Sequence, residues 1–595
     1  MWHHRVQSTP DAESMIYREG DGWKTITWKE AHARVHAFAC GLLSLELKKE
    51  ERCAILCGTR PEWILADMAI LCAAGATTTV YPSNTPQECA YILNDCGAVL
   101  AFCEDEVQVS KLREIRKEIP QLKHVIVFDG KASQDGWVQT GKQLEEAGRA
   151  FHEKNPEAYE AAHKAITSDQ LATLIYTSGT TGKPKGVMLS HDAWVYEAQA
   201  IDSIGMISPA DRQYLFLPLS HVFAKVMEVI FIRLGVPTVV DGDIDALIDN
   251  LSQTHPTWMG AVPRVFEKAY AKIVTGAKEA GGAKYKIFKW AVDVGTQVSA
   301  LRQQQKEPTG LLKWKYSVAD RLVFSKVKER FGGRLRFFIS GGAPLAKEIA
   351  EFFHACDILI LEGYGLSESG AASFCNSPDD FAFGTVGKPI PGCEVKIDET
   401  DGEILIRSRG VMQGYYNLKE QSDEVLTEDG WLKTGDIGVL LESGHLKITD
   451  RKKNIIVTAG GKNIAPARFE NLLKARCPYV SQVVMHGDKR PYCVALVTIN
   501  DESVGKWALE QGIEVSDYAS LAAQPAVKQL IEQAIDKVNQ ELPSYETVKK
   551  IALLPEDLTQ ENGALTPSMK IKKRVVKERY KEVLDALYDN PAQTV

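Results

Sequence analysis

The sequence contains no long hydrophobic run, no closely paired cysteines and no excess of basic charge. No stretch of eighteen or more apolar residues occurs in the 595 residues, and the N-terminus leads directly into polar residues. A membrane span and a signal peptide are therefore not expected, and the expected location is the cytoplasm. Lys and Arg total 70 against 78 for Asp and Glu, which argues against a nucleic-acid-binding protein because such a protein needs a basic surface.

The twelve cysteines form no CxxC pair, and none has a histidine partner at zinc-finger spacing. They are scattered among apolar residues, as small core side chains are in a reducing compartment. We therefore expect neither disulfides nor a cysteine-ligated zinc site. Hydrophobic residues make up 45% of the chain and charged residues 25%, which excludes a disordered or collagen-like protein.

Short apolar runs alternate with amphipathic stretches through most of the chain. This alternation is typical of an α/β protein with largely parallel sheets. The pattern predicts helices over 26–45 and 61–75, and strands over 52–57, 335–339 and 358–361. Pro61 is expected to begin the second of these helices, because proline is favoured at the first helical position.

The character of the sequence changes near residue 384. Many glycines and short apolar runs over 384–450 predict a small β-rich subdomain. A polar run follows at 450–454, and we place a domain boundary there, which gives domains of 1–450 and 451–595. In the second domain the pattern predicts strands over 482–486 and 493–499, and helices over 524–540 and 575–588.

The most informative segment is the loop between two predicted strands, 171–177 and 187–190. Glycines let backbone N–H groups approach an anion, while hydroxyl and lysine side chains add donors and positive charge. The candidate phosphate ligands are Thr177, Ser178, Gly179, Thr180, Thr181, Gly182, Lys183 and Lys185. A triphosphate is the expected ligand, and a hairpin loop without a ligand is the alternative. The loop is not a Walker A loop, because Pro184 follows Lys183 where Ser or Thr would hold magnesium, so a metal must be held elsewhere.

The stretch LIYTSGTTGKPKGVMLSH at 174–191 resembles the signature of the AMP-forming, adenylate-forming superfamily of acyl- and aryl-CoA synthetases, luciferases and adenylation domains. Further motifs follow in that family's order: LPLSHVF (217–223), ISGGAPL (339–345), EGYGLSES (362–369), TGDIG (434–438), DRKKNIIVTAGGKNIAP (450–466) and PSMKIKK (567–573). The resemblance implies an α/β fold whose large N-terminal domain has two α/β subdomains and a β-rich subdomain. A small, mobile α+β C-terminal domain completes it.

The resemblance also implies a two-step reaction. A carboxylate attacks the α-phosphate of Mg-ATP to give an acyl-adenylate and diphosphate, and a thiol, usually that of CoA, then displaces AMP. Lys570 corresponds to the catalytic lysine, although from the residues alone it is one lysine of a basic run. Glu368 corresponds to the acidic ligand of Mg²⁺, and Ser367 to a hydroxyl at the α-phosphate that is Thr in many relatives. The expected adenine and ribose ligands are Gly341, Gly342, Ala343, Pro344, Glu362, Gly363, Tyr364, Gly365, Asp436 and Arg451.

Other positions correspond to residues that, in the family's enzymes, allow domain movement or line the substrate site. Lys453 corresponds to the hinge about which the C-terminal domain is expected to rotate between the half-reactions. One conformation brings Lys570 to ATP, and the other presents the loop with Gly460 and Gly461 to CoA. His221 corresponds to a residue at the mouth of the acyl pocket, with an ordinary core histidine as the alternative.

Arg468 stands where many relatives have Glu, which leaves open an altered nucleotide contact or only a changed surface charge.

Two stretches, 256–268 and 319–345, resemble the long-chain fatty acyl-CoA synthetase branch in particular. This implies a fatty acid, ATP and CoA as substrates, with an apolar tunnel for the acyl chain. The alternatives are a ligase for another carboxylic acid, transfer to a carrier protein, and a catalytically inactive sensor of nucleotide or lipid. Basic and apolar residues over 313–336 are compatible with contact at the inner face of a membrane or with a solvated helix face. The sequence leaves acyl chain length and a homodimer open.

Overall fold

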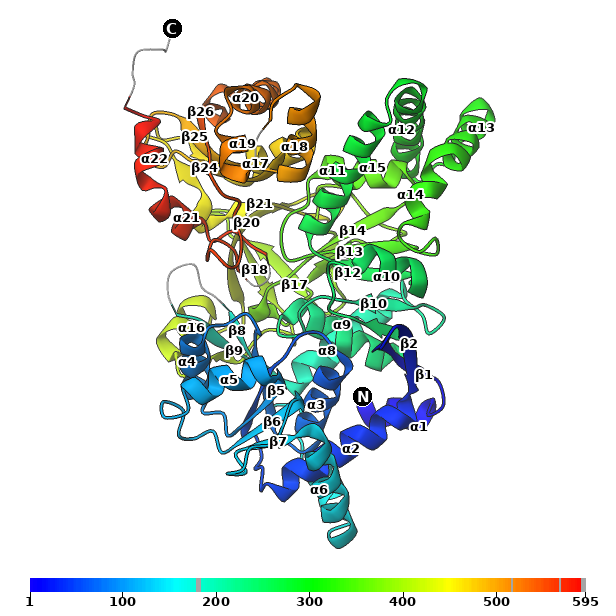
Figure 1. Ribbon diagram of the computed structural model, residues 1–595, viewed down its shortest axis with the longest axis vertical. Helices are drawn as coiled ribbons and strands as arrows, with labels where there is room; N and C mark the ends of the chain where they lie inside the picture. Colours follow the sequence, from blue (N-terminus) through cyan, green and yellow to red (C-terminus); the bar gives the residue numbers. More distant parts are fainter. Residues whose placement is uncertain (178–182, 515–516, 567–568, 590–595) are drawn as a thin grey trace.

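The computed structural model describes residues 1–177, 183–514, 517–566 and 569–589 (Figure 1). Within these ranges two large sheets organise the N-terminal part of the chain. The eight-stranded sheet has the order β19 (Gly414–Tyr415), β9 (Lys185–Ser190), β8 (Leu171–Thr177), β4 (Ala76–Val80), β3 (Arg52–Leu56), β5 (Leu100–Asp105), β6 (His124–Asp129) and β7 (Val138–Thr140). The nine-stranded sheet has the order β16 (Lys388–Pro389), β15 (Phe374–Cys375), β14 (Leu359–Tyr364), β13 (Phe337–Ser340), β12 (Trp258–Ala261), β10 (Gln213–Leu215), β11 (Thr238–Val240), β1 (Glu13–Glu19) and β2 (Gly22–Thr27).

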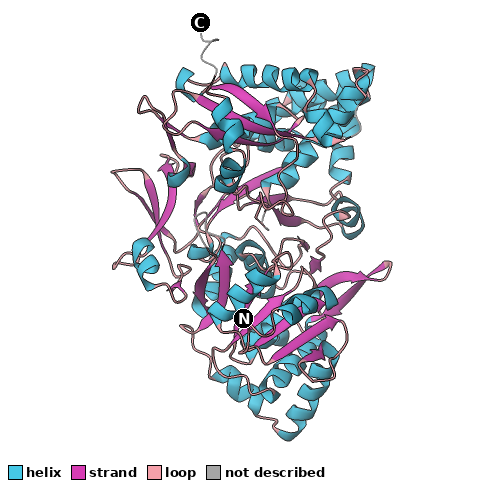
Figure 2. Cartoon of the chain, turned by 60° about the vertical axis from the view of Figure 1, so that its left-hand side comes forward, coloured by secondary structure: helices cyan, strands magenta, loops and turns pink. Residues whose placement is uncertain are grey.

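Helices pack between these two sheets and around them, as Figure 2 shows. They are α1 (Trp2–Ser8), α2 (Trp28–Ser44), α3 (Pro61–Cys72), α4 (Pro86–Cys96), α5 (Glu106–Glu114), α6 (Gly141–Lys154), α7 (Ala158–Lys164), α8 (His191–Ile204), α9 (Val222–Leu234), α10 (Leu247–Thr254), α11 (Pro263–Glu279), α12 (Gly282–Arg302), α13 (Gly310–Ala319), α14 (Ser325–Glu329), α15 (Lys347–Ala355) and α16 (Lys419–Val425), with short helical turns η1 (Asp320–Phe324) and η2 (Ser367–Ser369).

A smaller antiparallel sheet and the C-terminal domain complete the chain. The sheet consists of β17 (Glu394–Ile397), β18 (Glu403–Arg407), β20 (Leu432–Leu440) and β21 (Leu446–Arg451). The C-terminal elements are η3 (Lys452–Asn454), β22 (Ile456–Val457), β23 (Asn463–Ile464), α17 (Pro466–Arg476), β24 (Val480–His486), β25 (Cys493–Ile499), α18 (Asp501–Glu510), α19 (Tyr518–Ala522), α20 (Pro525–Asn539), η4 (Ser544–Glu546), β26 (Val548–Leu553), α21 (Lys573–Arg579) and α22 (Lys581–Ala586). In Figure 1 this domain, in yellow, orange and red, lies at the upper left, beside α11, α12 and α13 of the large domain.

Most of the predicted elements are confirmed. Helix α2 covers the first predicted helix, and Pro61 occupies the first turn of α3 as expected. Strands β8 and β9 form the predicted hairpin, with Thr177 opposite Lys185 in antiparallel register. The four-stranded sheet supplies the predicted β-rich subdomain. All twelve cysteines lie in the described residues and are free thiols.

One predicted helix is wrong. The single helix expected over 575–588 is two helices, α21 and α22, which meet at Tyr580. Its backbone angles (φ −104°, ψ 26°) leave the helical range, and its hydroxyl donates to Oε1 of Glu556 at 2.8 Å. The apolar spacing that suggested one helix survives, because Val576 and Leu584 are both buried in the same hydrophobic cluster.

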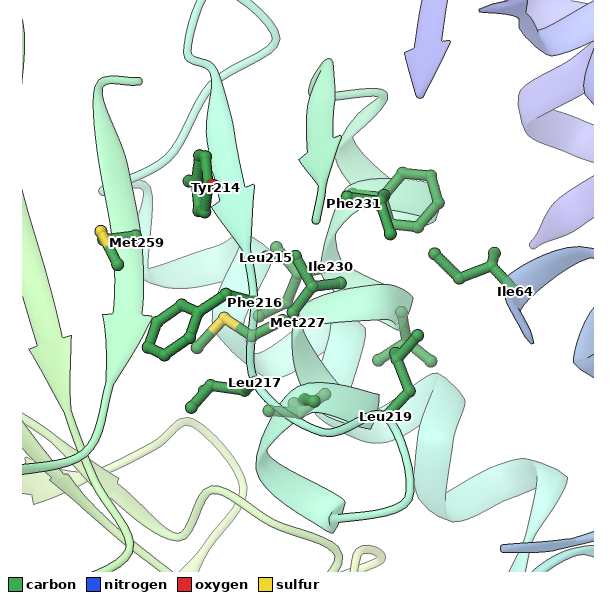
Figure 3. Packing of buried hydrophobic residues seen from close by; sticks show 14 of the residues in the cluster. Ile64, Tyr214, Leu215, Phe216, Leu217, Leu219, Met227, Ile230, Phe231 and Met259 are labelled. Atoms are coloured by element: carbon green, nitrogen blue, oxygen red, sulfur yellow. The ribbon is translucent and has the colours of Figure 1, made fainter. Parts of the chain in front are cut away.

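The core is continuous between the two large sheets. Figure 3 shows side chains of β10, its continuation and α9 packing together, with Ile64 of α3 facing Phe231 of α9. Helix α9 is apolar on nearly every face because it lies between layers rather than at the surface. No helix among the described residues has the length and apolarity needed to cross a membrane.

A buried charge cluster joins the two α/β layers. Lys225 of α9 forms an ion pair with Asp67 of α3, and its Nζ also donates to Oε2 of Glu228, one turn further along α9, at 3.0 Å. All three side chains are at most 1% exposed. Burial raises the pKa of Glu228 well above its ordinary value, which favours the neutral form of this carboxyl and leaves the Lys225–Asp67 contact as the ion pair of the cluster.

Candidate active site

A cavity of about 2820 Å³ opens between the large domain and the C-terminal domain. It lies at the carboxyl ends of β8, β13 and β14, the edge at which open α/β sheets bind ligands. Thr177 ends β8, Gly341 follows β13 and Tyr364 ends β14, and all three line the cavity. The fold therefore brings three separate sequence motifs to one place.

Asp436 and its partners form one wall. Both oxygens of its buried carboxylate are engaged: the hydroxyl of Tyr364 donates to Oδ2 at 2.6 Å, and Nε of Arg451 lies 3.0 Å from Oδ1. Burial raises the pKa of Asp436, and Arg451 opposes that rise. A carboxylate has about four acceptor positions, so this one keeps capacity for the two hydroxyls of a ribose.

Glu368 forms a second wall beside Tyr415. The hydroxyl of Tyr415 donates to Oε1 of Glu368 at 2.8 Å, and Nζ of Lys185 lies over the Tyr415 ring at 4.5 Å. Ser367 precedes Glu368 in η2 and also lines the cavity. Tyr415 was not predicted as a site residue, because it belongs to a two-residue strand, β19, which is too short to show an alternation of apolar and polar residues.

Lys570 reaches this cavity from the C-terminal domain. A Cβ placed on Gly342 would lie 3.9 Å from Cε of Lys570, so the lysine stem contacts the loop after β13. Burial, together with the charge of Arg451, lowers the pKa of Lys570 to about 8. Lys570 and Lys453 each interact electrostatically with Arg451, Asp436 and Glu368, and Lys453 also interacts with Lys185, so the site holds four cations and two carboxylates. An excess of positive charge suits a polyanion such as a triphosphate.

The structure describes the two ends of the predicted phosphate loop. Thr177 and Lys185 line the cavity, while Nζ of Lys183 lies over the ring of Tyr91 at 5.1 Å. The remaining predicted ligands, Ser178, Gly179, Thr180, Thr181 and Gly182, lie outside the described residues.

The predicted adenine-binding residues also come together. The two segments lie side by side in the cavity lining, because β13 and β14 are neighbouring parallel strands with Ser340 opposite Glu362; they contribute Gly341, Gly342, Ala343 and Pro344, and Glu362, Gly363, Tyr364 and Gly365. Gly365 cannot carry a side chain, since a Cβ there would lie 1.5 Å from the carbonyl oxygen of Ala371. Burial raises the pKa of Glu362 to about 7, and its Oε2 accepts from the backbone N–H of Leu345 at 3.2 Å.

His221 lies at the N-terminal cap of α9, where its Nδ1 accepts from the backbone N–H of Phe223 at 3.1 Å. Burial, assisted by Lys570, lowers the pKa of His221 to about 3, so the ring is neutral. It therefore lines the cavity as an uncharged group.

One part of the cavity lining, called here the apolar branch, consists of apolar side chains from α8 and the segment after it, from α9 and from β12. Its lining includes Ile201, Met206, Ile207, Val226, Met227, Ile230 and Trp258. Ile230 follows His221 by nine residues, which corresponds to about 13 Å along a helix. The sequence signal for this branch was the largely apolar character of α9, which is typical of a buried helix.

The predicted hinge residue lines the cavity, whereas the predicted CoA-loop glycines do not. Lys453 lies in η3 and lines the cavity, and burial lowers its pKa. Gly460 and Gly461 are not among the described lining residues, so they are not brought to Lys570 in this conformation. Arg468 lines the cavity from α17 and forms an ion pair with Glu546 at 3.0 Å.

Polar contacts between α11 and the C-terminal domain hold this conformation. Arg264 donates to the backbone oxygen of Ser481 at 2.8 Å and to its hydroxyl at 2.6 Å. Lys474 of α17 lies 2.6 Å from Glu267, and the two side chains are 17% and 8% exposed. These contacts link the two domains beside the cavity, because Arg264, Glu267 and Lys474 also line it.

Weakening these contacts should slow one half-reaction selectively. In Glu267→Gln the contact with Lys474 loses its negative charge and is weakened, and we expect adenylation about tenfold slower, with thioester formation from a supplied acyl-adenylate unchanged. Single-turnover assays of each half-reaction measure this. Lys506→Ala is the matched control, because its contact with Glu279 across the same interface is exposed and 3.5 Å long. Equal slowing of both half-reactions would show that the contacts do not select a conformation.

Comparisons with known proteins agree with this geometry. The model of the AMP-binding enzyme family matches residues 2–416, and that of the AMP-binding enzyme C-terminal domain matches residues 453–592. The chain belongs to the AMP-binding enzyme family.

Curated relatives extend over nearly the whole chain. Long-chain-fatty-acid–CoA ligase FadD15 of Mycobacterium tuberculosis is 36% identical over 587 residues, covering 97% of this chain and 95% of the relative. Long-chain-fatty-acid–CoA ligase ACSBG1 of Homo sapiens is 32% identical over 623 residues, covering 99% and 84%.

Solved structures share the fold at lower identity. The A domain of carboxylic acid reductase from Segniliparus rugosus, in complex with AMP and a co-purified carboxylic acid, gives a TM-score of 0.75 at 21% identity, covering 99% of this chain and 93% of that one. The o-succinylbenzoate CoA synthetase of Bacillus subtilis, in complex with ATP and a magnesium ion, gives 0.67 at 21% identity, covering 97% and 98%.

Proposed function

We propose that the protein is an ATP-dependent long-chain fatty acid–CoA ligase, which converts a fatty acid, ATP and CoA into acyl-CoA, AMP and diphosphate through an acyl-adenylate. The observation that carries the proposal is the convergence of Lys570, Glu368 and the Asp436–Arg451 pair on one cavity with an apolar branch. Relatives of the same name at 31–36% identity over nearly the full chain support it.

Each group has a distinct task in adenylation. Asp436 accepts from the ribose hydroxyls and fixes the nucleotide, while Tyr364 lies against the adenine. Lys570 places a cation where negative charge develops on the α-phosphate as the fatty carboxylate attacks, and Lys185 and Thr177 bind the other phosphates. Neutral His221 lies where the apolar branch meets the cavity, so it lets a carboxylate pass without forming an ion pair.

Glu368 fits the role of a magnesium ligand. Mg²⁺ in nucleotide sites is usually held by one or two carboxylates together with substrate phosphates, and Glu368 offers a cavity-lining carboxylate oriented by Tyr415. When bound, the ion would neutralise charge on the phosphates.

The second half-reaction requires the C-terminal domain, which we place at 451–595, to turn about Lys453. That rotation would withdraw Lys570 and bring Gly460 and Gly461 to the cavity for the CoA thiol. Strand β21 ends at Arg451 and η3 follows it, so a rotation at Lys453 would leave the four-stranded sheet intact.

The lowered pKa of Lys570 predicts an alkaline limit to adenylation. Only the protonated amine is a cation, and its pKa of about 8 in the free enzyme means that kcat/KM for ATP should fall above about pH 8. In Lys570→Arg the guanidinium stays charged, so the rate is lower but this limb should disappear. An alkaline limb that is identical in both proteins would assign the titration to another group.

The apolar branch predicts a chain-length effect at Ile230. The larger side chain in Ile230→Trp should block the branch, lowering kcat/KM for palmitate at least about tenfold while leaving short acids within about twofold. Leu509→Trp, at a 71% exposed position on α18, is the matched control. Equal losses on long and short acids would place the acyl chain elsewhere.

A substrate panel tests the function itself. Purified protein with Mg-ATP is offered acids from acetate to long-chain fatty acids and several aryl acids, with and without CoA. We expect AMP formation to peak on long-chain acids and to require CoA for turnover. A peak on acetate or an aryl acid, or release of acyl groups only to a carrier protein, would favour the alternative ligases.

We also propose that the protein contacts an anionic membrane. Leu311, Trp314 and Leu322 are 65%, 63% and 45% exposed on α13 and η1, beside the exposed cations Lys313 and Arg321. In Figure 1, α12 and α13 project from the upper edge of the large domain. Exposed apolar side chains with cations beside them bind to anionic bilayers, because the apolar groups insert into the interface and the cations are attracted to the lipid head groups.

Co-sedimentation tests this contact. The protein should sediment with phosphatidylglycerol vesicles more than with phosphatidylcholine vesicles, and Trp314→Ala should reduce the bound fraction. Leu509→Ala should have no effect. Unchanged binding by Trp314→Ala would remove this surface from consideration.

A further inference from the structure

A cluster of histidine and cysteine side chains lies outside the cavity, where α2 packs against α6. Among the residues that the structure describes, His36, Cys40 and His152 form the one group of at least three histidine, cysteine or acidic side chains whose ligand atoms all lie within 4.8 Å of one another. None of the three lines the cavity, so the proposed ligase activity gives them no role.

The helices place these side chains together for local reasons. His36 and Cys40 are four residues apart on α2, so they share one face, and the Cys40 sulfur lies 3.9 Å from the His36 ring nitrogens. Gly148 lets α6 come unusually close, because a Cβ there would lie only 1.9 Å from the carbonyl oxygen of Ala37. His152 is one turn beyond Gly148, and its ring centroid lies 4.6 Å from that of His36.

One polar atom in the cluster lacks a partner. Nδ1 of His152 is shielded from solvent and has no hydrogen-bond partner in the described part of the chain. A buried ring nitrogen without a partner is unfavourable, and a bound ligand would satisfy it. The nearby His3, by contrast, is already engaged, because its Nε2 lies 3.0 Å from the hydroxyl of Tyr159.

We propose that His36, Cys40 and His152 bind a divalent transition metal, for which Zn²⁺ is the best-fitting ion. Imidazole nitrogen and thiolate sulfur are its usual ligands, and tetrahedral zinc geometry separates such a nitrogen and sulfur by about 3.6 Å. The sulfur lies 3.9 Å from both ring nitrogens of His36, so metal binding requires the ring to rotate and turn one nitrogen toward the ion. Cys40 gives its thiol proton to solvent as the sulfur binds the metal.

Water would supply the fourth ligand of the metal, because His36 and His152 are only half-buried. The ion would cross-link α2 and α6. This site departs from the expectation that the cysteines hold no zinc. That expectation relied on zinc-finger spacing, whereas here the third ligand comes from a separate helix.

Cobalt binding tests the site. Metal-stripped, tag-free full-length protein is titrated with Co²⁺, and we expect one tightly bound equivalent with tetrahedral d–d bands and a near-ultraviolet thiolate-to-cobalt charge-transfer band. Cys40→Ser should remove the charge-transfer band, and His152→Gln should weaken Co²⁺ binding at least about tenfold. His163→Gln is the matched control, because His163 stacks on His3 at 3.8 Å but is outside the three-residue group.

Absence of the charge-transfer band in the wild-type protein, or its persistence in Cys40→Ser, would overturn the proposal. Equal weakening by His152→Gln and His163→Gln would also overturn it. Should Cys40→Ser fail to fold, the half-buried His152 gives the second test: Zn²⁺ should raise the unfolding temperature of the wild-type protein and not that of His152→Gln. An equal rise in both proteins would contradict the site.

Discussion

Replacing Lys570 by Ala should slow adenylation by about 10²- to 10³-fold while leaving ATP affinity nearly unchanged. The lysine enters from the C-terminal domain and its Cε lies beside Gly342 in the loop after β13, so its loss removes charge stabilisation from the α-phosphate without disturbing the nucleotide-binding walls. Asp436, Tyr364 and Arg451 remain in place to bind ATP. Rapid-quench measurement of acyl-adenylate formation gives the rate, and equilibrium dialysis gives the affinity.

Lys528→Ala is the matched control for this variant. Lys528 belongs to the same domain, but its side chain is 51% exposed on α20 and its partner is Glu532, 3.7 Å away. It should adenylate at the wild-type rate. An unchanged rate in Lys570→Ala would remove the lysine from the chemistry, and absence of adenylation in the wild-type protein as well would favour a nucleotide or lipid sensor.

Replacing Lys225 by Met should destabilise the large domain by about 3–5 kcal/mol. The substitution leaves Asp67 charged and buried between α3 and α9 without its counter-ion. Scanning calorimetry should show the large-domain transition several degrees lower. Because the cluster joins the layers of the two sheets, aggregation on heating should begin earlier too.

The double variant Lys225→Met/Asp67→Asn should recover much of this loss, because it removes the unpaired charge as well. Lys419→Met is the matched surface control, since its pair with Asp423 is 2.7 Å long but the side chains are 86% and 62% exposed. It should not shift the transition. A Lys225→Met protein as stable as wild type would mean that water or a proton compensates Asp67.

The sequence was most informative where function requires contiguous residues. The hairpin around the phosphate loop, the strand ends before Gly341 and Tyr364, and the β-rich subdomain were all predictable, because each combines a periodic apolar run with glycine at its end. The joint placement of Lys570 with Glu368 and Asp436 came from the resemblance, since no local pattern relates residues so far apart in the chain.

Other features depend on contacts between elements that are distant in sequence. Tyr415 orients Glu368 from a two-residue strand, and Glu267 meets Lys474 across a domain interface. The break at Tyr580 was missed because the apolar spacing of α21 and α22 continues through it. The cluster of His36, Cys40 and His152 depends on the close approach that Gly148 allows, which spacing along one helix does not reveal.

Exchange of labelled diphosphate into ATP tests the central claim most directly, because it reports reversible formation of an acyl-adenylate without the thiol step. With Mg²⁺ and palmitate, the wild-type protein should exchange label rapidly, and Lys570→Ala should exchange it about 10²- to 10³-fold more slowly. Failure of the wild-type protein to exchange label with any acid from acetate to long-chain fatty acids would contradict the account.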